Sequence, residues 1–141
     1  MMDPADRRAE RGWRPPRHTE AMTRPIDLAA ILSTIDSPWK PHTVAAVNDY
    51  DVRVVKTRGE FTEHAHPETD ELFLVLSGSL VIRLGDEELT LGPGQLAVVP
   101  RGRRHQPIST QGAEVLLIEP RATVNTGDTP SQLTTEPVRL L

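Results

Sequence analysis

The most informative part of this 141-residue chain is Gly59-Glu-Phe-Thr-Glu-His64-Ala-His66-Pro-Glu-Thr-Asp-Glu71-Leu-Phe-Leu-Val-Leu-Ser-Gly78. His64 and His66 are two residues apart, so on a strand both side chains point to the same face. Two imidazoles at that spacing can take adjacent positions on one metal ion. Residues 67–70 then form a loop that resets the side-chain register. Glu71, which opens the next strand, can therefore return to the same interior.

A third histidine, His105, lies far along the chain, just after a Pro100-Arg101-Gly102 turn. Three neutral imidazoles and one carboxylate are a suitable ligand set for a divalent first-row metal. The spacing alone leaves an alternative open, because histidines are often surface residues or hydrogen-bonded core residues. Glu71, beside Asp70, can equally be a solvated acid in a turn.

Most of the chain between residues 43 and 119 has the pattern of short β-strands. Residues 80–84 and 87–91 flank Gly85-Asp86, which is a good hairpin signal. The strands expected from β-branched and alternating residues are 43–47, 50–57, 71–77, 80–84, 87–91, 95–99 and 114–119. Turn signals recur roughly every 8–12 residues, which predicts an all-β sandwich or barrel.

Composition excludes several classes of function. The net charge of -4 does not favour a dedicated nucleic-acid binder, which usually has a basic domain or stripe. The absence of cysteine excludes disulfides, zinc–thiolate sites, iron–sulfur clusters and thiol catalysis. Apolar stretches are at most four or five residues long, whereas a membrane span needs roughly twenty. No apolar segment typical of a secretion signal follows Arg7-Arg8, so we expect a cytoplasmic protein without nucleic-acid or membrane partners.

The two ends of the chain differ from its centre. Residues 1–24 are polar and rich in arginine, and we expect a disordered tail there. Residues 25–42 are expected to form one short helix, within 25–35, and an extended connector. Residues 125–141 are polar and expected to be loose, apart from the apolar end Val138-Arg139-Leu140-Leu141. That end can dock on the barrel or on a neighbouring subunit.

Two motifs resemble those of the cupin superfamily. The stretch from Gly59 to Gly78 is similar to the first cupin motif, with its glycine, two histidines, glutamate and glycine at the family's intervals. The stretch Gly94-Gln-Leu-Ala-Val-Val-Pro100-Arg-Gly102-Arg-Arg-His105-Gln-Pro-Ile-Ser109 resembles the second motif. It departs from the family pattern at Ser109, where asparagine is usual, and this position is not a metal ligand. Among cupins, the chain looks most like the small single-domain group labelled mannose-6-phosphate-isomerase-like.

The resemblance implies an all-β fold, a double-stranded β-helix or jelly-roll barrel over residues 43–124, preceded by one short N-terminal helix. It also implies that His64, His66, Glu71 and His105 bind one divalent metal ion. Iron, manganese, zinc, nickel and copper all suit this ligand set, so the sequence does not distinguish among them.

The resemblance further implies a metal-dependent enzyme that acts on a small polar or anionic metabolite by oxygenase, isomerase or lyase chemistry. The alternative is a small-ligand binding or sensing module without catalysis. Arg101, Arg103 and Arg104 precede His105 and can steer a carboxylate or phosphate to the site, unless they form only a solvated basic loop. A homodimer is expected through residues 43–47 and 50–57, because small jelly rolls expose sheet edges.

Overall fold

A computed structural model of the chain describes residues 24–141. The tail expected over residues 1–24 therefore lies outside the described residues, apart from Arg24. The helix α3 (Leu28–Leu32) is shorter than expected and begins where the Asp27 side chain accepts a hydrogen bond from the Ala30 N–H at 3.1 Å. No helix in the described part of the chain has the length and apolar character needed to cross a membrane.

The β-strands follow the expected pattern in most of the chain. In chain order they are β1 (His42–Val47), β2 (Tyr50–Glu60), β3 (Glu71–Gly78), β4 (Leu80–Leu84), β5 (Glu87–Leu91), β6 (Leu96–Val99), β7 (Gln106–Pro120) and β8 (Val138–Arg139). The expected hairpin is present, with Gly85 at φ 63° between β4 and β5. The main difference is β7, which begins eight residues earlier than expected and is 15 residues long.

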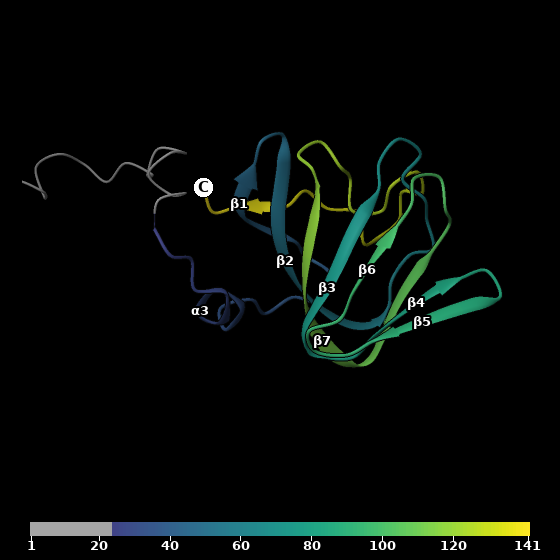
Figure 1. Cartoon of the computed structure of the whole chain (residues 1–141), viewed down its shortest axis with the longest axis horizontal. Coiled ribbons are helices and arrows are strands. Elements are labelled where there is room, and N and C mark those ends of the chain that lie inside the picture. The colour runs from purple at the N-terminus through teal and green to yellow at the C-terminus, as the bar shows by residue number, and fades with distance from the viewer. Residues whose placement is uncertain (1–23) are drawn as a thin grey trace, which may run out of the picture.

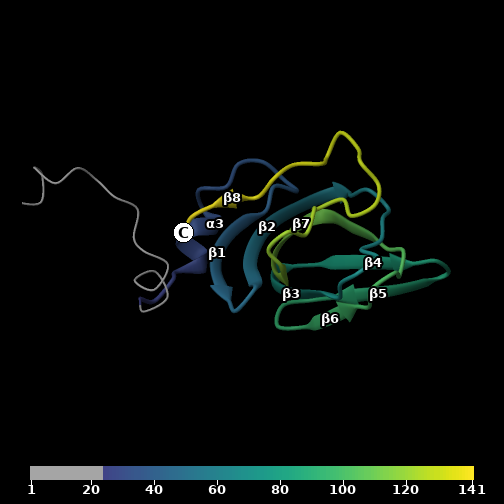
Figure 2. The same cartoon turned by 90° about the horizontal axis from the view of Figure 1, so that it is seen from above.

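The long strand β7 organises the sheet (Figure 1). Its first residues pair with β4, its later residues pair with β3, and β2 follows it on the other side from Tyr50↔Pro120 to Glu60↔Ile108. The path of hydrogen-bonded strands is β5-β4-β7-β2-β1-β8, with β3 on β7 and β6 on β3. The sheet curls over itself without closing, as in a jelly roll (Figure 2). The predicted all-β jelly-roll fold with one short helix is thus confirmed.

Two apolar clusters stabilise this arrangement. The larger one fills the curled sheet, with Val75, Leu80, Ile82 and Val115 fully buried. It follows from strict alternation along β3, where Glu71, Phe73 and Val75 all point inward. In the smaller cluster, Leu32 and Ile35 from the helical region cover Val44 and Val54 on the outer side of the sheet.

The C-terminal segment (residues 121–141) differs from the loose tail that its polar composition indicates. Asn125 and Thr126 are buried, and the Asn125 side chain donates to the Leu133 carbonyl and accepts from the Thr135 N–H. The apolar end docks on the barrel of its own chain, where β8 lies parallel to β1 and the Leu140 N–H donates to the Thr43 carbonyl at 2.9 Å (Figure 2). Long-range hydrogen bonds therefore hold a segment that has little local propensity.

Candidate metal centre

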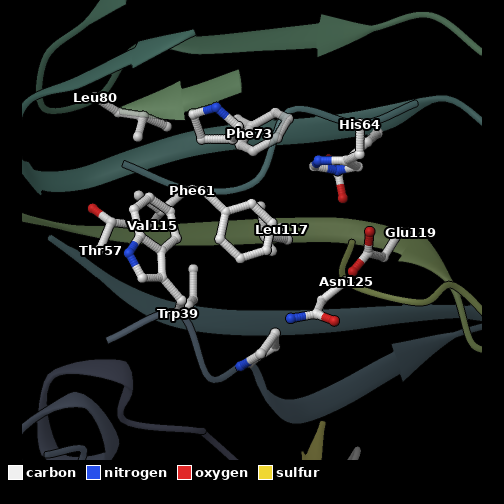
Figure 3. A pocket seen from close by; sticks show the side chains of 14 residues that line it. Trp39, Thr57, Phe61, His64, Phe73, Leu80, Val115, Leu117, Glu119 and Asn125 are labelled. Carbon is white, nitrogen blue, oxygen red and sulfur yellow. The ribbon is translucent and has the colours of Figure 1, made fainter. Parts of the chain in front are cut away.

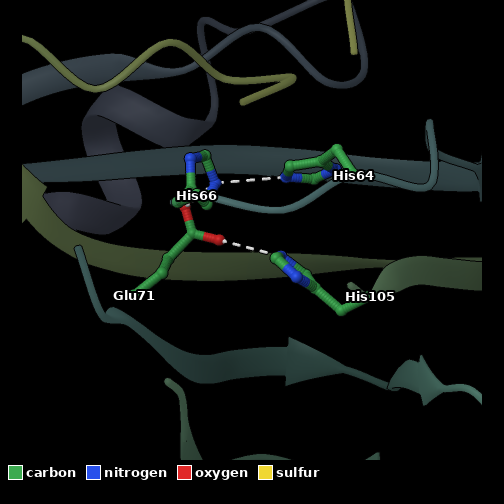
Figure 4. A group of neighbouring side chains, drawn as sticks. All are labelled: His64, His66, Glu71 and His105. Carbon is green, nitrogen blue, oxygen red and sulfur yellow. Dashed lines mark hydrogen bonds and ion pairs between the residues drawn. The ribbon is translucent and has the colours of Figure 1, made fainter. Parts of the chain in front are cut away.

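Four side chains from three separate parts of the chain meet inside the barrel (Figure 4). His64 and His66 lie between β2 and β3, Glu71 is the first residue of β3, and His105 directly precedes β7. A two-way backbone pair joins His64 to His105, with N···O distances of 3.0 and 2.8 Å. All four side chains are buried. The structure thus brings together the complete ligand set that the sequence predicted.

The donor atoms are close enough to share one ion. His64 Nε2 is 3.1 Å from His66 Nε2, and the two Glu71 oxygens each lie 3.5 Å from an Nε2 atom, of His66 and of His105. All the potential ligand atoms lie within 4.8 Å of one another. Two nitrogen ligands at ~2.1 Å from an ion and at right angles would be ~3.0 Å apart, which matches the His64–His66 separation.

The remaining hydrogen bonds of the rings also fit a metal. His64 Nδ1 lies 2.7 Å from the Thr62 carbonyl and His105 Nδ1 lies 2.9 Å from the Arg103 carbonyl, so each Nδ1 is the donor nitrogen. This leaves Nε2 of both rings unprotonated and directed at the shared space. Within residues 24–141, His105 Nε2 is buried without a hydrogen-bond partner. A bound cation would satisfy this nitrogen.

Burial sets the protonation of the centre. Desolvation, reinforced by the neighbouring His105 and His66, lowers the pKa of His64 from 6.5 to about 4, so its ring is neutral at pH 7. Burial alone would raise the pKa of Glu71, but a hydrogen bond with Glu119 and the two imidazoles of His105 and His66 beside it hold that pKa well below its ordinary value. Glu71 is therefore a carboxylate, which is the form that binds a metal.

Glu119 near the end of β7 is a site residue that the sequence analysis missed. Its side chain is 1% exposed and accepts a hydrogen bond from Arg53 at 2.7 Å. Burial and the charge of Glu71 raise the pKa of Glu119 well above its ordinary value, although Arg53 opposes the shift. The available signal was Asp51-Val-Arg53 in β2, where opposite charges alternate with apolar residues and occupy the inward face.

A cavity of about 40 Å³ is lined by two of the four candidate ligands, His64 and Glu71, and it has one polar and one apolar end (Figure 3). His64, Glu119 and Asn125 lie at one end, and Trp39 and Leu80 lie toward the other. The ring centroids of Trp39 and Phe61 are 4.8 Å apart, and the Trp39 indole N–H donates to the Arg58 carbonyl. The rest of the apolar lining is formed by Pro41, Val55, Phe73, Pro107, Val115 and Leu117. The cavity therefore suits a compact, mainly apolar group.

The three arginines expected near the substrate lie on the surface. Arg101 is 3.4 Å from Asp70, and Arg103 is 3.8 Å from Glu87. Arg104 is 3.5 Å from both Glu63 and Asp128. All three side chains are about half exposed or more, and none lines the cavity. The structure does not bring them to the metal ligands, so their surroundings are those of a solvated basic loop.

Comparisons with known proteins agree with this geometry. The cupin domain family matches residues 51–120. An uncharacterized Bacillus subtilis protein, YdbB, is 34% identical over 86 residues, which are 60% of this chain and 76% of YdbB. The crystal structure of a cupin-2 domain containing protein from Shewanella frigidimarina is 37% identical, with a TM-score of 0.69, and the match covers 71% of this chain and 98% of that one.

An enzyme is also among the similar structures. Hydroquinone 1,2-dioxygenase from Sphingomonas sp. TTNP3, in complex with 4-nitrophenol, is 25% identical with a TM-score of 0.62. The match covers 69% of this chain but only 32% of the dioxygenase. With the curled sheet and the four convergent ligands, these similarities show that the chain belongs to the cupin superfamily.

Proposed function

We propose that this protein binds one divalent metal ion through His64, His66, Glu71 and His105 and acts on a small, mainly apolar compound that has a hydroxyl group. The observation that supports this most directly is a cluster of four buried donor groups, two of which, His64 and Glu71, line an aromatic-lined cavity. The hydroquinone dioxygenase, whose structure has a bound phenol, favours an oxygenase of phenol-like compounds over an isomerase or a lyase.

The ligand set has a defined chemical role in this proposal. A bound ion supplies Lewis acidity and, if it is iron or manganese, a redox centre. One carboxylate on a divalent ion leaves a net positive charge, which favours a negatively charged oxygen donor such as a deprotonated hydroxyl. Three imidazoles and one carboxylate leave positions open on an octahedral ion for such a donor.

The rest of the site binds and orients the substrate. Trp39 and Phe61 offer faces against which a flat ring packs, and the surrounding apolar side chains exclude water. Glu119 and Asn125 are polar groups at the ligand end that a substrate hydroxyl can contact. Because the lining is mainly apolar, we propose an apolar, hydroxylated substrate in place of the polar or anionic metabolite expected from the sequence. A cavity of about 40 Å³ holds only a few waters, so a substrate ring must widen it.

Elemental analysis tests the metal site. The protein, purified without a histidine tag, is compared with the His64→Ala/His66→Ala variant and with His42→Ala, which removes a histidine outside the ligand set. We expect close to one metal ion per chain in the wild type and in His42→Ala, and none in the folded double variant. A wild type that stays empty with every divalent ion would overturn the site.

Oxygen uptake tests the reaction. The protein loaded with iron(II) or manganese(II) is given a series of monophenols and hydroquinones. We expect turnover that falls at least a hundredfold in Glu71→Ala. Trp39→Ala should raise KM at least tenfold, whereas Arg101→Ala/Arg104→Ala should leave KM unchanged. A metal-loaded protein that binds phenols but returns them unaltered would instead be a non-catalytic binding module.

A further inference from the structure

The backbone of the residue between the two ligand histidines is held at both its N–H and its carbonyl by one residue of the C-terminal segment. The Ala65 N–H donates to Asp128 Oδ1 at 2.9 Å, and the Asp128 N–H donates to the Ala65 carbonyl at 3.0 Å. Ala65 is the residue between His64 and His66. Both backbone polar groups of this residue are therefore fixed by Asp128, and with them the spacing of the two imidazoles.

Gly127 brings the chain into direct contact with the same backbone. A Cβ atom at this position would lie 2.2 Å from the Ala65 carbonyl oxygen and 2.9 Å from Cδ2 of His64, and the residue has φ +53°. No side chain fits there without displacing the backbone between the histidines or the His64 ring. The aromatic neighbours of this ring are Phe61, His66 and His105, at centroid distances of 5.5, 4.8 and 4.4 Å.

The turn that contains Gly127 and Asp128 is itself well anchored. Thr126 is fully buried, and its hydroxyl is 2.6 Å from that of Thr134. The Gly127 N–H donates to the Val124 carbonyl at 2.9 Å. Asp128 Oδ1 also accepts from the Thr129 hydroxyl, and Asp128 Oδ2 lies 3.5 Å from Arg104. The turn is therefore a rigid support for the histidine pair.

We infer that Gly127 and Asp128 are positioning residues that set the placement of His64 and His66 and thereby the affinity of the site for its metal. This inference rests on the metal site proposed above. The family match ends at residue 120, so these two residues lie beyond the part of the chain that it covers. Outer-shell groups that orient metal ligands typically change metal affinity 10–100-fold when they are removed.

Cobalt(II) titration, followed by visible absorption, tests the inference on the full chain. Gly127→Ala and Asp128→Ala should each weaken cobalt binding at least tenfold and alter the absorption bands. Asp128→Asn keeps the Oδ1 acceptor for the Ala65 N–H, so its affinity should stay within threefold of the wild type. The matched glycine control is Gly85→Ala, because Gly85 has φ +63° but no atom within 4 Å of its Cβ position. Asp86→Ala in the same hairpin is the control for loss of an aspartate.

Measurements on the metal-free protein separate this inference from the proposed function. The Ala65 amide should exchange at least tenfold faster in Asp128→Ala than in Asp128→Asn. The ring NMR signals of His64 and His66 should shift in Gly127→Ala but not in Gly85→Ala. If both differences are found but the wild type binds no cobalt, the metal site is overturned while the positioning role of Gly127 and Asp128 stands. A Gly127→Ala variant with the cobalt affinity, absorption bands and ring signals of Gly85→Ala would overturn the inference. If Gly127→Ala does not fold, the Asp128 variants decide. Equal cobalt affinity and equal Ala65 amide exchange in Asp128→Ala and Asp128→Asn would overturn the inference.

Discussion

His64 has the most constrained surroundings of the four ligands. Its backbone pairs with His105, its Nδ1 lies 2.7 Å from the Thr62 carbonyl, and its Nε2 faces His66. The side chain is 1% exposed, so a protonated imidazole would lose nearly all of its hydration. The folded chain therefore keeps this ring neutral, which prepares it for a metal but opposes folding in acid.

The metal-free protein should lose stability as the pH falls from 6.5 to 4. The pKa of His64 is about 4 in the folded chain against 6.5 as its ordinary value, so within this range the unfolded chain binds a proton that the folded chain rejects. The contribution of His64 to the free energy of unfolding is fully present above pH 6.5. It falls by up to about 3 kcal/mol by pH 4, because one pKa unit corresponds to about 1.4 kcal/mol. Urea unfolding at several pH values measures this change.

His64→Gln is the control for that experiment, because it keeps a polar side chain that does not titrate. The part of the pH dependence that belongs to His64 should be absent in this variant. Equal pH profiles for His64→Gln and the wild type would contradict the assignment.

At the scale of elements, a buried ionic group joins β2 to β7 and to the C-terminal segment. Arg53 is fully buried and lies 2.7 Å from Glu119 on β7 and 3.3 Å from Asp51 on its own strand. Its guanidinium also donates to the carbonyls of Thr123 and Arg121. Arg139 on β8 reaches the same Asp51 at 2.9 Å. This one network therefore determines where Glu119 sits in the cavity and where the chain end docks.

Arg53→Met should lower the free energy of unfolding by about 3–5 kcal/mol, because it leaves buried Glu119 without its cationic partner. The matched control is Arg83→Met on β4. Arg83 lies 3.2 Å from Glu88, but both side chains are about half exposed, so its loss should cost less than about 1 kcal/mol. Urea unfolding compares the two. Equal losses would show that burial does not strengthen the role of Arg53.

At the scale of the whole molecule, a dimer formed by strand pairing needs a free sheet edge, and β2 does not provide one. β2 has β1 on one side and β7 on the other, and β8 pairs with β1 at His42 and Thr43. By contrast, within the described residues 24–141, β6 has β3 as its single partner strand. Leu96 and Val98 on β6 are more than half exposed. The edge of β6 is therefore better suited to a partner than β2, which has no free edge.

The homodimer stays a prediction, and light scattering at micromolar concentration measures it directly. We expect twice the 15.6 kDa mass of the chain. Leu96→Lys should shift the mass toward that of the monomer if the edge of β6 is the contact, because a lysine on an edge strand opposes pairing. Val47→Lys on β1 is the matched control, since Val47 is equally exposed at 56%. A wild type with the monomer mass would refute the dimer.

The sequence predicted those parts of the fold that depend on local pattern. The β4–β5 hairpin follows from Gly85-Asp86 between two β-branched or alternating runs, and the cluster of four candidate ligands follows from the resemblance to the two cupin motifs. Glu119 was missed because its partner Arg53 is distant in sequence, and charged residues in an alternating strand are usually assigned to the outer face. The early start of β7 was missed because Pro107 and Gly112 resemble breaks in a strand. The polar groups of residues 121–137 find their partners only in the folded chain.

The pairing of β2 with β7 also has a consequence for biosynthesis. The two strands pair from Tyr50↔Pro120 to Glu60↔Ile108. During translation, the residues of β2 are therefore synthesised 48 to 70 residues before their partners in β7. At ~5–20 residues per second, this delay lasts roughly 2 to 14 s. Asp51 and Arg53 place charges in β2 while it is still unpaired with β7, and charged residues suppress aggregation of apolar segments. We therefore expect Asp51 and Arg53, which are buried in the folded chain, to oppose aggregation of the nascent chain.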